Sequence, residues 1–171
     1  MGAGAGYKPG RRADGGFTLV ELVLVLLITG TLAGIAAPRY YASLNHYRVQ
    51  SAARRLVADL EFARTLARTS GQLVKVEFKD ENKHDRYLFK DIPDQHDPDE
   101  DYTVRVIDSP WHCKFVLIDI DGPDAVRFTP EGLAIKGDKN QPVGWATLKL
   151  ETGGIQRTIT IDGQTGRATI Q

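Results

Sequence analysis

One long apolar stretch near the N-terminus constrains this chain more than any other feature. Residues 17–37 are 21 residues whose only ionisable side chain is that of Glu21. As an α-helix rising about 1.5 Å per residue, this stretch would reach about 30 Å, the thickness of the hydrocarbon core of a bilayer. The stretch therefore predicts a transmembrane helix. The more polar residues after it predict one further domain of about 130 residues.

A short basic segment precedes the apolar stretch. Residues 1–16 contain Lys8, Arg11 and Arg12 against Asp14, whereas the whole chain balances 22 basic with 22 acidic side chains. The positive-inside bias would hold this segment in the cytoplasm. A cleaved secretory signal would have a shorter apolar region without a carboxylate, so the sequence favours a signal anchor.

The junction of the two segments carries a motif, "GFTLVE", from Gly16 to Glu21. With its basic leader and long apolar continuation, it resembles the class III signal of type IV pilins and type II secretion pseudopilins. The resemblance implies that a membrane-embedded prepilin peptidase removes a leader of residues 1–16 by cutting between Gly16 and Phe17. It also implies methylation of the new amino terminus, and a helix over 17–37 that serves first in the membrane and then in a filament core.

Glu21 is unusual in a membrane helix, where a carboxylate costs about 2.5–3.5 kcal/mol. No cationic side chain within 17–37 can pair with it. The freed amino group of Phe17 in another copy could do so, and an axial slip between subunits would then leave two buried charges unmatched. The other interpretation is that Glu21 lies near the interface, where it snorkels or stays protonated.

Residues 38–70 continue the helix with a different pattern. Pro38 is expected to kink or end a continuous helix, and Gly71 suits a C-cap. Charged residues, Asp59 among them, fall largely away from the apolar positions, and the arginines are interpreted as a solvated face rather than a nucleic-acid site. The positions predicted to be buried are Val49, Ala52, Leu56, Leu60, Ala63 and Ala67.

After Gly71 the apolar period changes to two, which predicts β-strands. "DGQTG", residues 162–166, is expected to form a hairpin turn. The predicted fold class is α+β: a long N-terminal helix, membrane anchor plus amphipathic half, packed on a C-terminal antiparallel β domain of residues 71–171. Alternating strands are expected near 74–78, 102–106, 126–129, 145–150, 155–161 and 167–170, with a fully buried strand at 115–118.

The β domain carries a second resemblance. "VRFTPEGLA" (126–134) and "RTITIDGQTGRATI" (157–170) are similar to the closing pattern of GspH/FimT-type minor pseudopilins. One branch of that family serves type IV pili in DNA uptake through a G-R-x-R segment. This chain has Gly-Arg-Ala-Thr instead, and loss of one cation weakens phosphate binding. The matching positions are Phe128, Gly132, Thr165, Gly166 and Arg167.

Neither the residue pattern nor the resemblance indicates an enzyme, a cofactor or a metal site. The neighbours His112 and Cys113 would point to opposite faces of a strand, so a core thiol is expected. The acidic stretches 91–101 and 119–124 lack EF-hand spacing, and a solvated acidic loop is expected at 91–101.

The resemblances together imply a minor pseudopilin of a type II secretion pseudopilus. It would be a single-pass inner-membrane protein with its C-terminal domain in the periplasm. Its partners would be other pseudopilins or pilins, prepilin peptidase and an exported protein, while nucleic acid is disfavoured. The alternatives are a type IV pilus minor pilin in pilus assembly or DNA uptake, and a bitopic membrane protein with a periplasmic ligand-binding domain.

Overall fold

The computed structural model describes residues 16–79, 85–94, 97–120, 124–137 and 141–171. These residues form two units that meet between Tyr40 and Tyr41 and are described separately. One helix, α1 (Leu19–Ser70), runs through both. The predicted leader, apart from Gly16, lies outside the described residues.

In the first unit, the described residues are the N-terminal part of α1 and the three residues before it. The hydroxyl of Thr18 accepts a hydrogen bond from the backbone N–H of Glu21 at 3.2 Å, as an N-cap side chain does. The apolar window of α1 is long enough to cross a membrane, and none of it is buried within the chain. The helix does not end at Pro38 but continues through it.

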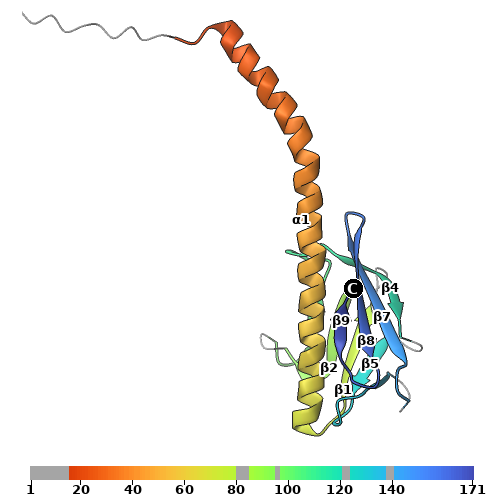
Figure 1. Cartoon of the computed structure of the whole chain (residues 1–171). Helices are drawn as coiled ribbons and strands as arrows, with labels where there is room; N and C mark the ends of the chain where they lie inside the picture. The colour runs from red at the N-terminus through yellow and green to blue at the C-terminus, as the bar shows by residue number, and fades with distance from the viewer. Residues whose placement is uncertain (1–15, 80–84, 95–96, 121–123, 138–140) are drawn as a thin grey trace, which may run out of the picture. The chain divides into compact units, whose positions relative to one another are not determined.

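The second unit begins with the remainder of α1, which packs one face on two β-sheets (Figure 1). The six predicted core positions between Val49 and Ala67 are each at most 1 % exposed. Gly71 ends the helix with a φ of 69° and donates a hydrogen bond to the carbonyl of Ala67 at 3.0 Å. Both the half-buried face and the glycine C-cap are confirmed.

The sheets are antiparallel at every strand pair. The five-stranded sheet has the order β3-β2-β1-β5-β6, and the four-stranded sheet has the order β4-β7-β8-β9. The predicted α+β fold class, with one long N-terminal helix and antiparallel strands, is confirmed. The strands are β1 (Val74–Lys79), β2 (Arg86–Pro93), β3 (Asp101–Arg105), β4 (Lys114–Asp119), β5 (Ala125–Phe128), β6 (Ala134–Lys136), β7 (Trp145–Thr152), β8 (Ile155–Asp162) and β9 (Ala168–Ile170).

Three of these strands differ from the sequence prediction. β2 and β6 were not predicted, and β2 occupies the start of the stretch that was expected to be an acidic loop. The prediction that 115–118 is fully buried is wrong, because Val116 and Leu117 are 40 % and 38 % exposed. β4 is an edge strand with a register shift between Phe115 and Leu117, and such an irregularity turns side chains out of the core.

The two sheets are joined where β8 ends. The carbonyl of Gly163 accepts a hydrogen bond from the backbone N–H of Ala134 at 2.9 Å. A Cβ atom at Gly163 would lie 1.5 Å from the carbonyl oxygen of Val143, so a residue with a side chain could not occupy this position without moving the backbone. This contact fixes the end of the five-stranded sheet against the β8–β9 turn.

Candidate functional site

The first candidate site is the exposed apolar surface of residues 17–37. Apolar side chains point outward on all sides of this part of the helix. Phe17 near its start is 82 % exposed, and Ile35 near its end is 68 % exposed. A helix that is apolar all round is stable only when lipid or other helices cover it. The single carboxylate on this surface, that of Glu21, lies in the first turn of α1.

The N-terminal end of this surface, at Gly16 and Phe17, is open to solvent. Gly16 and Phe17 precede α1, and among the described residues other than its chain neighbour no atom lies within 4 Å of the Cβ position of Gly16. Thr18 and Glu21 have the Thr-x-x-Glu spacing of a capping box, in which the acidic side chain also interacts favourably with the helix dipole. Glu21 thus lies in the first turn, where a carboxylate complements the positive end of the helix dipole.

The second candidate site is the set of family-motif positions in the β domain. Phe128 is fully buried in the core, next to Val74 of β1. Gly132 and Gly166 have φ values of 86° and 62° and lie in contact with one another. Arg64 of α1 donates from its Nε atom to the carbonyl oxygen of Gly132 at 3.2 Å. The helix, the β5–β6 turn and the β8–β9 turn therefore meet at these two glycines.

The β8–β9 turn is held by Asp162. Its carboxylate accepts hydrogen bonds from the backbone N–H of Gln164 at 2.9 Å and from the hydroxyl of Thr165 at 3.0 Å. The hydroxyl of Thr165 in turn accepts from the backbone N–H of Arg167 at 3.3 Å. The side chain of Arg167 is exposed. Of the five motif positions, Phe128 and the two glycines thus serve packing, and Thr165 stabilises the turn. Arg167 is the only charged residue of the five, and its side chain is exposed to solvent.

Replacing Gly166 with alanine should destabilise the second unit by about 2–4 kcal/mol. The new Cβ would lie 2.2 Å from the carbonyl oxygen of Gly132, and φ would remain positive. Gly154 is the matched control, because its φ is 81° but no atom lies within 4 Å of its Cβ position. Gly154→Ala should therefore cost only about 1–2 kcal/mol. Chemical denaturation of both variants would measure the difference, and equal losses would contradict the packing role of Gly166.

Sequence reasoning missed a polar group between α1 and the five-stranded sheet. Asp59 is only 7 % exposed although it was placed with the solvated residues. Its Oδ2 atom accepts from the Tyr87 hydroxyl at 2.5 Å and from Arg55 Nε at 2.9 Å, and Arg55 also donates to the Tyr102 hydroxyl at 2.5 Å. Burial and the negative charge of Asp59 raise the pKa of Tyr87, so its hydroxyl stays a donor.

A signal for Asp59 was present in the sequence. Position 59 lies three residues after Leu56 and seven after Ala52, so it falls on the same helical face as the apolar positions. An open pocket of about 530 Å³ adjoins the group and is lined partly by Phe62, which is 52 % exposed.

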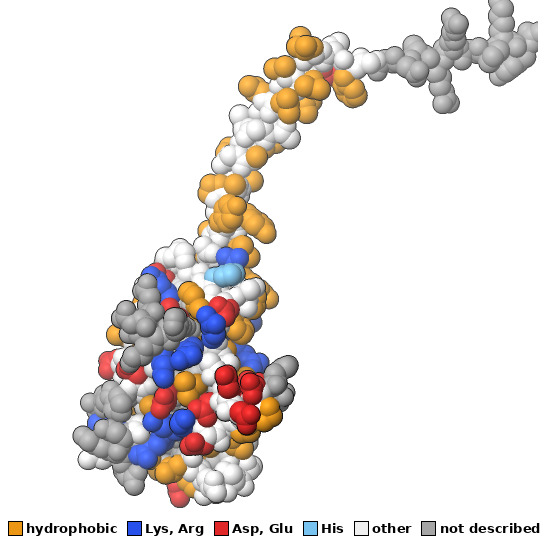
Figure 2. Space-filling view, turned by 180° about the vertical axis from the view of Figure 1, so that it is seen from behind, with side chains coloured by type: hydrophobic (Ala, Val, Ile, Leu, Met, Phe, Trp, Pro, Cys, Tyr) orange, Lys and Arg blue, Asp and Glu red, His pale blue; other side chains and the backbone are white. Residues whose placement is uncertain are grey.

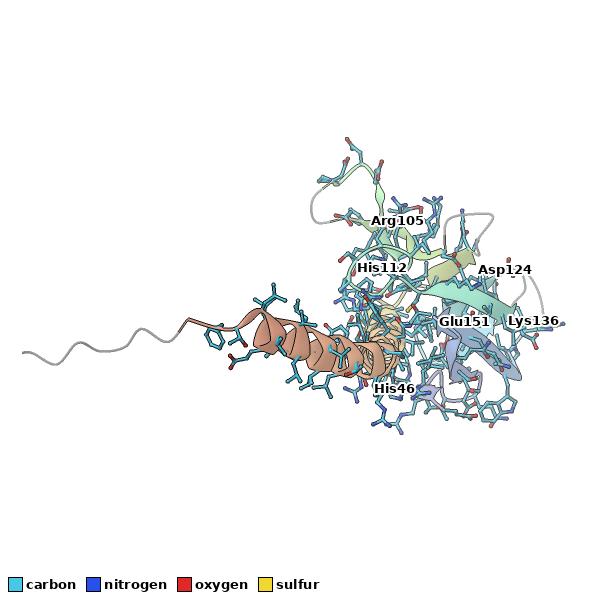
Figure 3. The ribbon with its side chains drawn as sticks, turned by 90° about the horizontal axis from the view of Figure 1, so that it is seen from above. His46, Arg105, His112, Asp124, Lys136 and Glu151 are labelled. Atoms are coloured by element: carbon cyan, nitrogen blue, oxygen red, sulfur yellow. The ribbon has the colours of Figure 1, made fainter. Side chains whose placement is uncertain are left out.

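The thiol and the histidines show no catalytic arrangement among the described residues. Cys113 is fully buried in the core, as predicted, while the side chain of its neighbour His112 is exposed. Figure 3 shows His112 and His46 at separate places on the β3–β4 connection and on α1. Within the described ranges, no three His, Cys, Asp or Glu side chains are placed to hold a metal ion, and Asp121 lies outside those ranges.

The thiol of Cys113 should be unreactive in the folded protein. Burial raises its pKa to about 11, so the thiolate fraction at neutral pH is small, and the sulfur is not accessible. We expect negligible labelling by iodoacetamide at pH 7 and full labelling in denaturant. Rapid labelling of the native chain would show that the core around Cys113 opens.

Comparison with known proteins finds matches in both the N-terminal helix and the β domain. The family described as type II transport protein GspH matches residues 52–165, and the prokaryotic N-terminal methylation motif matches residues 11–37. The pilin-like protein PilA1 of Thermus thermophilus is 32 % identical over 162 residues, which cover 91 % of this chain and 97 % of that protein. The type IV minor pilin FimU of Pseudomonas aeruginosa is 14 % identical, with a TM-score of 0.49 over 74 % of this chain and 90 % of FimU.

The methylation motif coincides with the exposed apolar helix, which indicates a single-pass membrane anchor. The GspH match runs from Ala52 on the buried helix face to Thr165, just after β8. Proteins of this kind are structural and assemble with other pilins into filaments. The chain belongs to the GspH family of type II transport proteins and is a type IV pilin-like minor pilin or pseudopilin.

Proposed function

We propose that this chain is a minor pseudopilin of a type II secretion pseudopilus. Prepilin peptidase removes residues 1–16, and the mature chain leaves the membrane to enter the filament through residues 17–37. Residues 38–70 form the amphipathic half of the helix, and residues 71–171 form the globular domain on the periplasmic side of the inner membrane. The description of the matched family as a type II transport protein supports this assignment.

One observation carries the proposal. The apolar surface of residues 17–37 is exposed in the single chain, and it begins directly at Gly16 and Phe17, where the methylation motif lies. Such a surface needs a cover, which is lipid before assembly and neighbouring helices afterwards. A cut at Gly16 leaves the whole surface on the mature protein.

The assembly step assigns a role to Glu21. In the membrane its carboxylate has no cationic partner within residues 17–37. In the filament, the amino group of Phe17 on a neighbouring subunit pairs with it. The net gain from this pair is small because desolvation opposes it, but a mismatched register is strongly disfavoured. Glu21 thus fixes how far one helix slides along the next.

Processing is the direct test. The full chain should be expressed in membranes with and without prepilin peptidase, and the amino terminus of the product should be sequenced. We expect a product that starts at methylated Phe17 only when the peptidase is present. The matched control is Gly16→Val, which changes the residue before the cut and leaves the apolar helix intact. An intact Met1 terminus in the presence of active peptidase would overturn the proposal.

A second candidate function is that of a minor pilin in a type IV pilus, in pilus assembly or in DNA uptake. The observation that favours it is the relative named a pilin-like protein, which matches almost over its full length. Deletion of the gene distinguishes the two functions, since loss of protein secretion supports the first and loss of pili or DNA uptake supports the second. The segment after Gly166 offers a single arginine, so we expect weak DNA binding at physiological salt.

A further inference from the structure

The open pocket of about 530 Å³ beside Asp59 is a groove between α1, the end of β2 and the start of β3. We define the apolar groove by the side chains that give it apolar surface, which are Phe62, Ile92, Pro93 and Tyr102. Phe62 is 52 % exposed, and Pro93 is also exposed. Apolar and aromatic side chains that gather in an exposed concave site are typical of a surface that binds another protein.

The walls of the apolar groove are held in place within the chain. Phe62 and Tyr102 both contact the ring of the fully buried Phe89, with ring centroids 6.2 Å and 5.2 Å apart. The hydroxyl of Tyr102 accepts a hydrogen bond from Arg55, which also pairs with Asp59. The groove is therefore formed before a partner binds, which lowers the entropic cost of binding.

One rim of the apolar groove is acidic. Asp94 lines the groove, and its backbone N–H donates to the carbonyl oxygen of Glu100 at 2.9 Å, so the β2–β3 turn is tied to this edge. We define the acidic turn as Asp97, Asp99 and Glu100, whose exposed side chains form no ion pair among the described residues. Figure 2 shows acidic side chains gathered on one side of the globular part.

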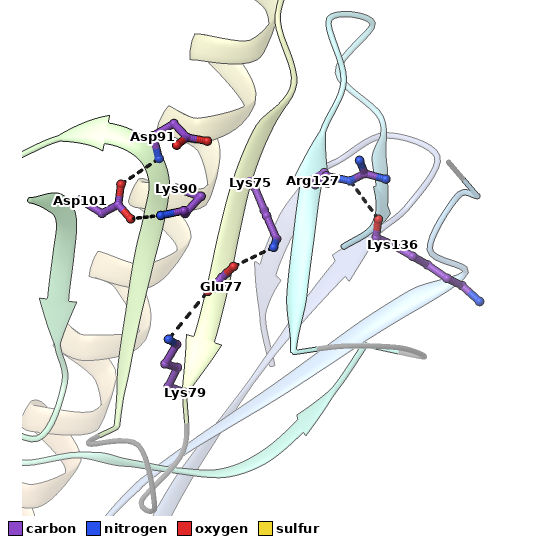
Figure 4. Close-up of polar contacts among 8 residues, drawn as sticks. All are labelled: Lys75, Glu77, Lys79, Lys90, Asp91, Asp101, Arg127 and Lys136. Carbon is purple, nitrogen blue, oxygen red and sulfur yellow. Dashed lines mark hydrogen bonds and ion pairs between the residues drawn. The ribbon is translucent and has the colours of Figure 1, made fainter. Parts of the chain in front are cut away.

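Two cations close to this rim in the fold are already engaged within the chain. The Nζ atom of Lys90 lies 2.8 Å from Oδ2 of Asp101, and Oδ1 of Asp101 accepts from the backbone N–H of Asp91 at 2.9 Å (Figure 4). Arg55 is paired with Asp59 at 2.9 Å. The acidic turn therefore keeps its negative charge, which attracts cations on a partner.

We propose that the apolar groove and the acidic turn together bind a different pilin-like subunit. The segment that binds carries a large apolar side chain flanked by lysine or arginine. The apolar side chain enters between Phe62 and Tyr102, and the flanking cation lies against the acidic turn. Charge complementarity selects a basic partner, and the shape of the groove selects its apolar side chain. The inference rests on the proposed function, because it names what a neighbouring subunit of the filament presents to this chain.

The test uses short dye-labelled peptides that differ only in their central sequences, Lys-Phe-Lys, Glu-Phe-Glu and Lys-Ser-Lys. The full chain is held in phosphatidylcholine nanodiscs, whose neutral surface does not attract basic peptides, and fluorescence anisotropy measures binding. We expect the Lys-Phe-Lys peptide to bind at least about tenfold more tightly than either of the others. Its advantage over Glu-Phe-Glu should shrink at about 1 M salt, where the Debye length is only about 3 Å.

Two variants locate the binding. Phe62→Gln removes an aromatic wall but keeps a good helix former, so it should weaken binding of Lys-Phe-Lys to the level of Lys-Ser-Lys. Asp99→Lys/Glu100→Lys should reverse the preference, so that Glu-Phe-Glu binds more tightly than Lys-Phe-Lys. Asp119→Lys/Glu131→Lys is the matched control, because it makes the same change of net charge at exposed residues on β4 and next to β6, at the edge of the five-stranded sheet opposite to β3. The control should leave the preference unchanged.

Unchanged binding by Phe62→Gln, or equal effects of the control and the acidic-turn variant, would overturn the inference. Labelling of Cys113 reports whether each variant is folded, and the acidic-turn variant tests the inference without touching the core. In cells, a photoreactive residue at position 62 should cross-link to a different pilin-like subunit, at a large apolar residue next to lysine or arginine. Cross-linking only to a second copy, or to no pilin-like subunit, would also overturn it. Processing after Gly16 is measured on the same chains, so a normal cut without peptide discrimination refutes only the groove.

Discussion

Glu21→Ala is expected to block incorporation of the chain into filaments while leaving cleavage and membrane insertion intact. Insertion should improve, because a carboxylate in a membrane helix costs about 2.5–3.5 kcal/mol. Assembly should fail, because the amino group of Phe17 on the neighbouring subunit would have no partner inside an apolar bundle. The measurement is the fraction of chain recovered in sheared filaments relative to the membrane fraction, and we expect a fall of at least about tenfold.

Substitutions at Glu21 and Thr18 separate the effect of the charge on assembly from the effect of helix capping. The backbone N–H of Glu21 donates to the Thr18 hydroxyl, and the two residues have capping-box spacing, so Glu21→Ala removes both a charge and the side chain that this spacing assigns to the cap. Glu21→Gln keeps a capping-box side chain and removes only the charge, so it should fail to assemble as Glu21→Ala does. Thr18→Ala removes the cap at a cost of about 1 kcal/mol and should still assemble. Normal assembly of Glu21→Gln would assign Glu21 to the helix start alone.

The sequence predicted the elements whose burial follows a simple period. The helix face from Val49 to Ala67 repeats every three to four residues, and the strands near 74–78 and 155–161 alternate cleanly, so each element agreed with its prediction. β2 escaped prediction because Tyr87, Leu88 and Phe89 are consecutive buried residues that give no alternation. β6 is only three residues long, and its place depends on Gly163 from a distant turn.

The candidate sites likewise divide into a motif that is local in the sequence and contacts that only the fold brings together. The local motif from Gly16 to Glu21 could be recognised from the sequence, because its parts are adjacent in the chain. The contact of Gly132 with Gly166 joins turns that are far apart in sequence, and only the fold shows why both must be glycine.

Asp59→Ala is expected to destabilise the second unit by about 3 kcal/mol. The change leaves the hydroxyl of Tyr87, on a fully buried side chain, without an acceptor and removes the ion pair with Arg55. Denaturant unfolding of residues 41–171 would measure this loss, because the hydrophobic core lies entirely between Val49 and Ala168. Glu61→Ala is the control: Glu61 pairs with Arg64 at the surface, and its loss should cost less than about 1 kcal/mol.

A second substitution shows whether Asp59 acts through Tyr87. Tyr87→Phe removes the hydroxyl but leaves Arg55 paired with Asp59, so it should cost about 1–2 kcal/mol. In Asp59→Ala/Tyr87→Phe no buried donor remains unsatisfied, and the double variant should be more stable than the sum of the single losses predicts by about 1 kcal/mol or more. Strict additivity would contradict the coupling and would assign the cost of Asp59→Ala to its pairing with Arg55. Coupling would instead identify the hydrogen bond from Tyr87 to Asp59 as one of the polar contacts that stabilise α1 on the five-stranded sheet.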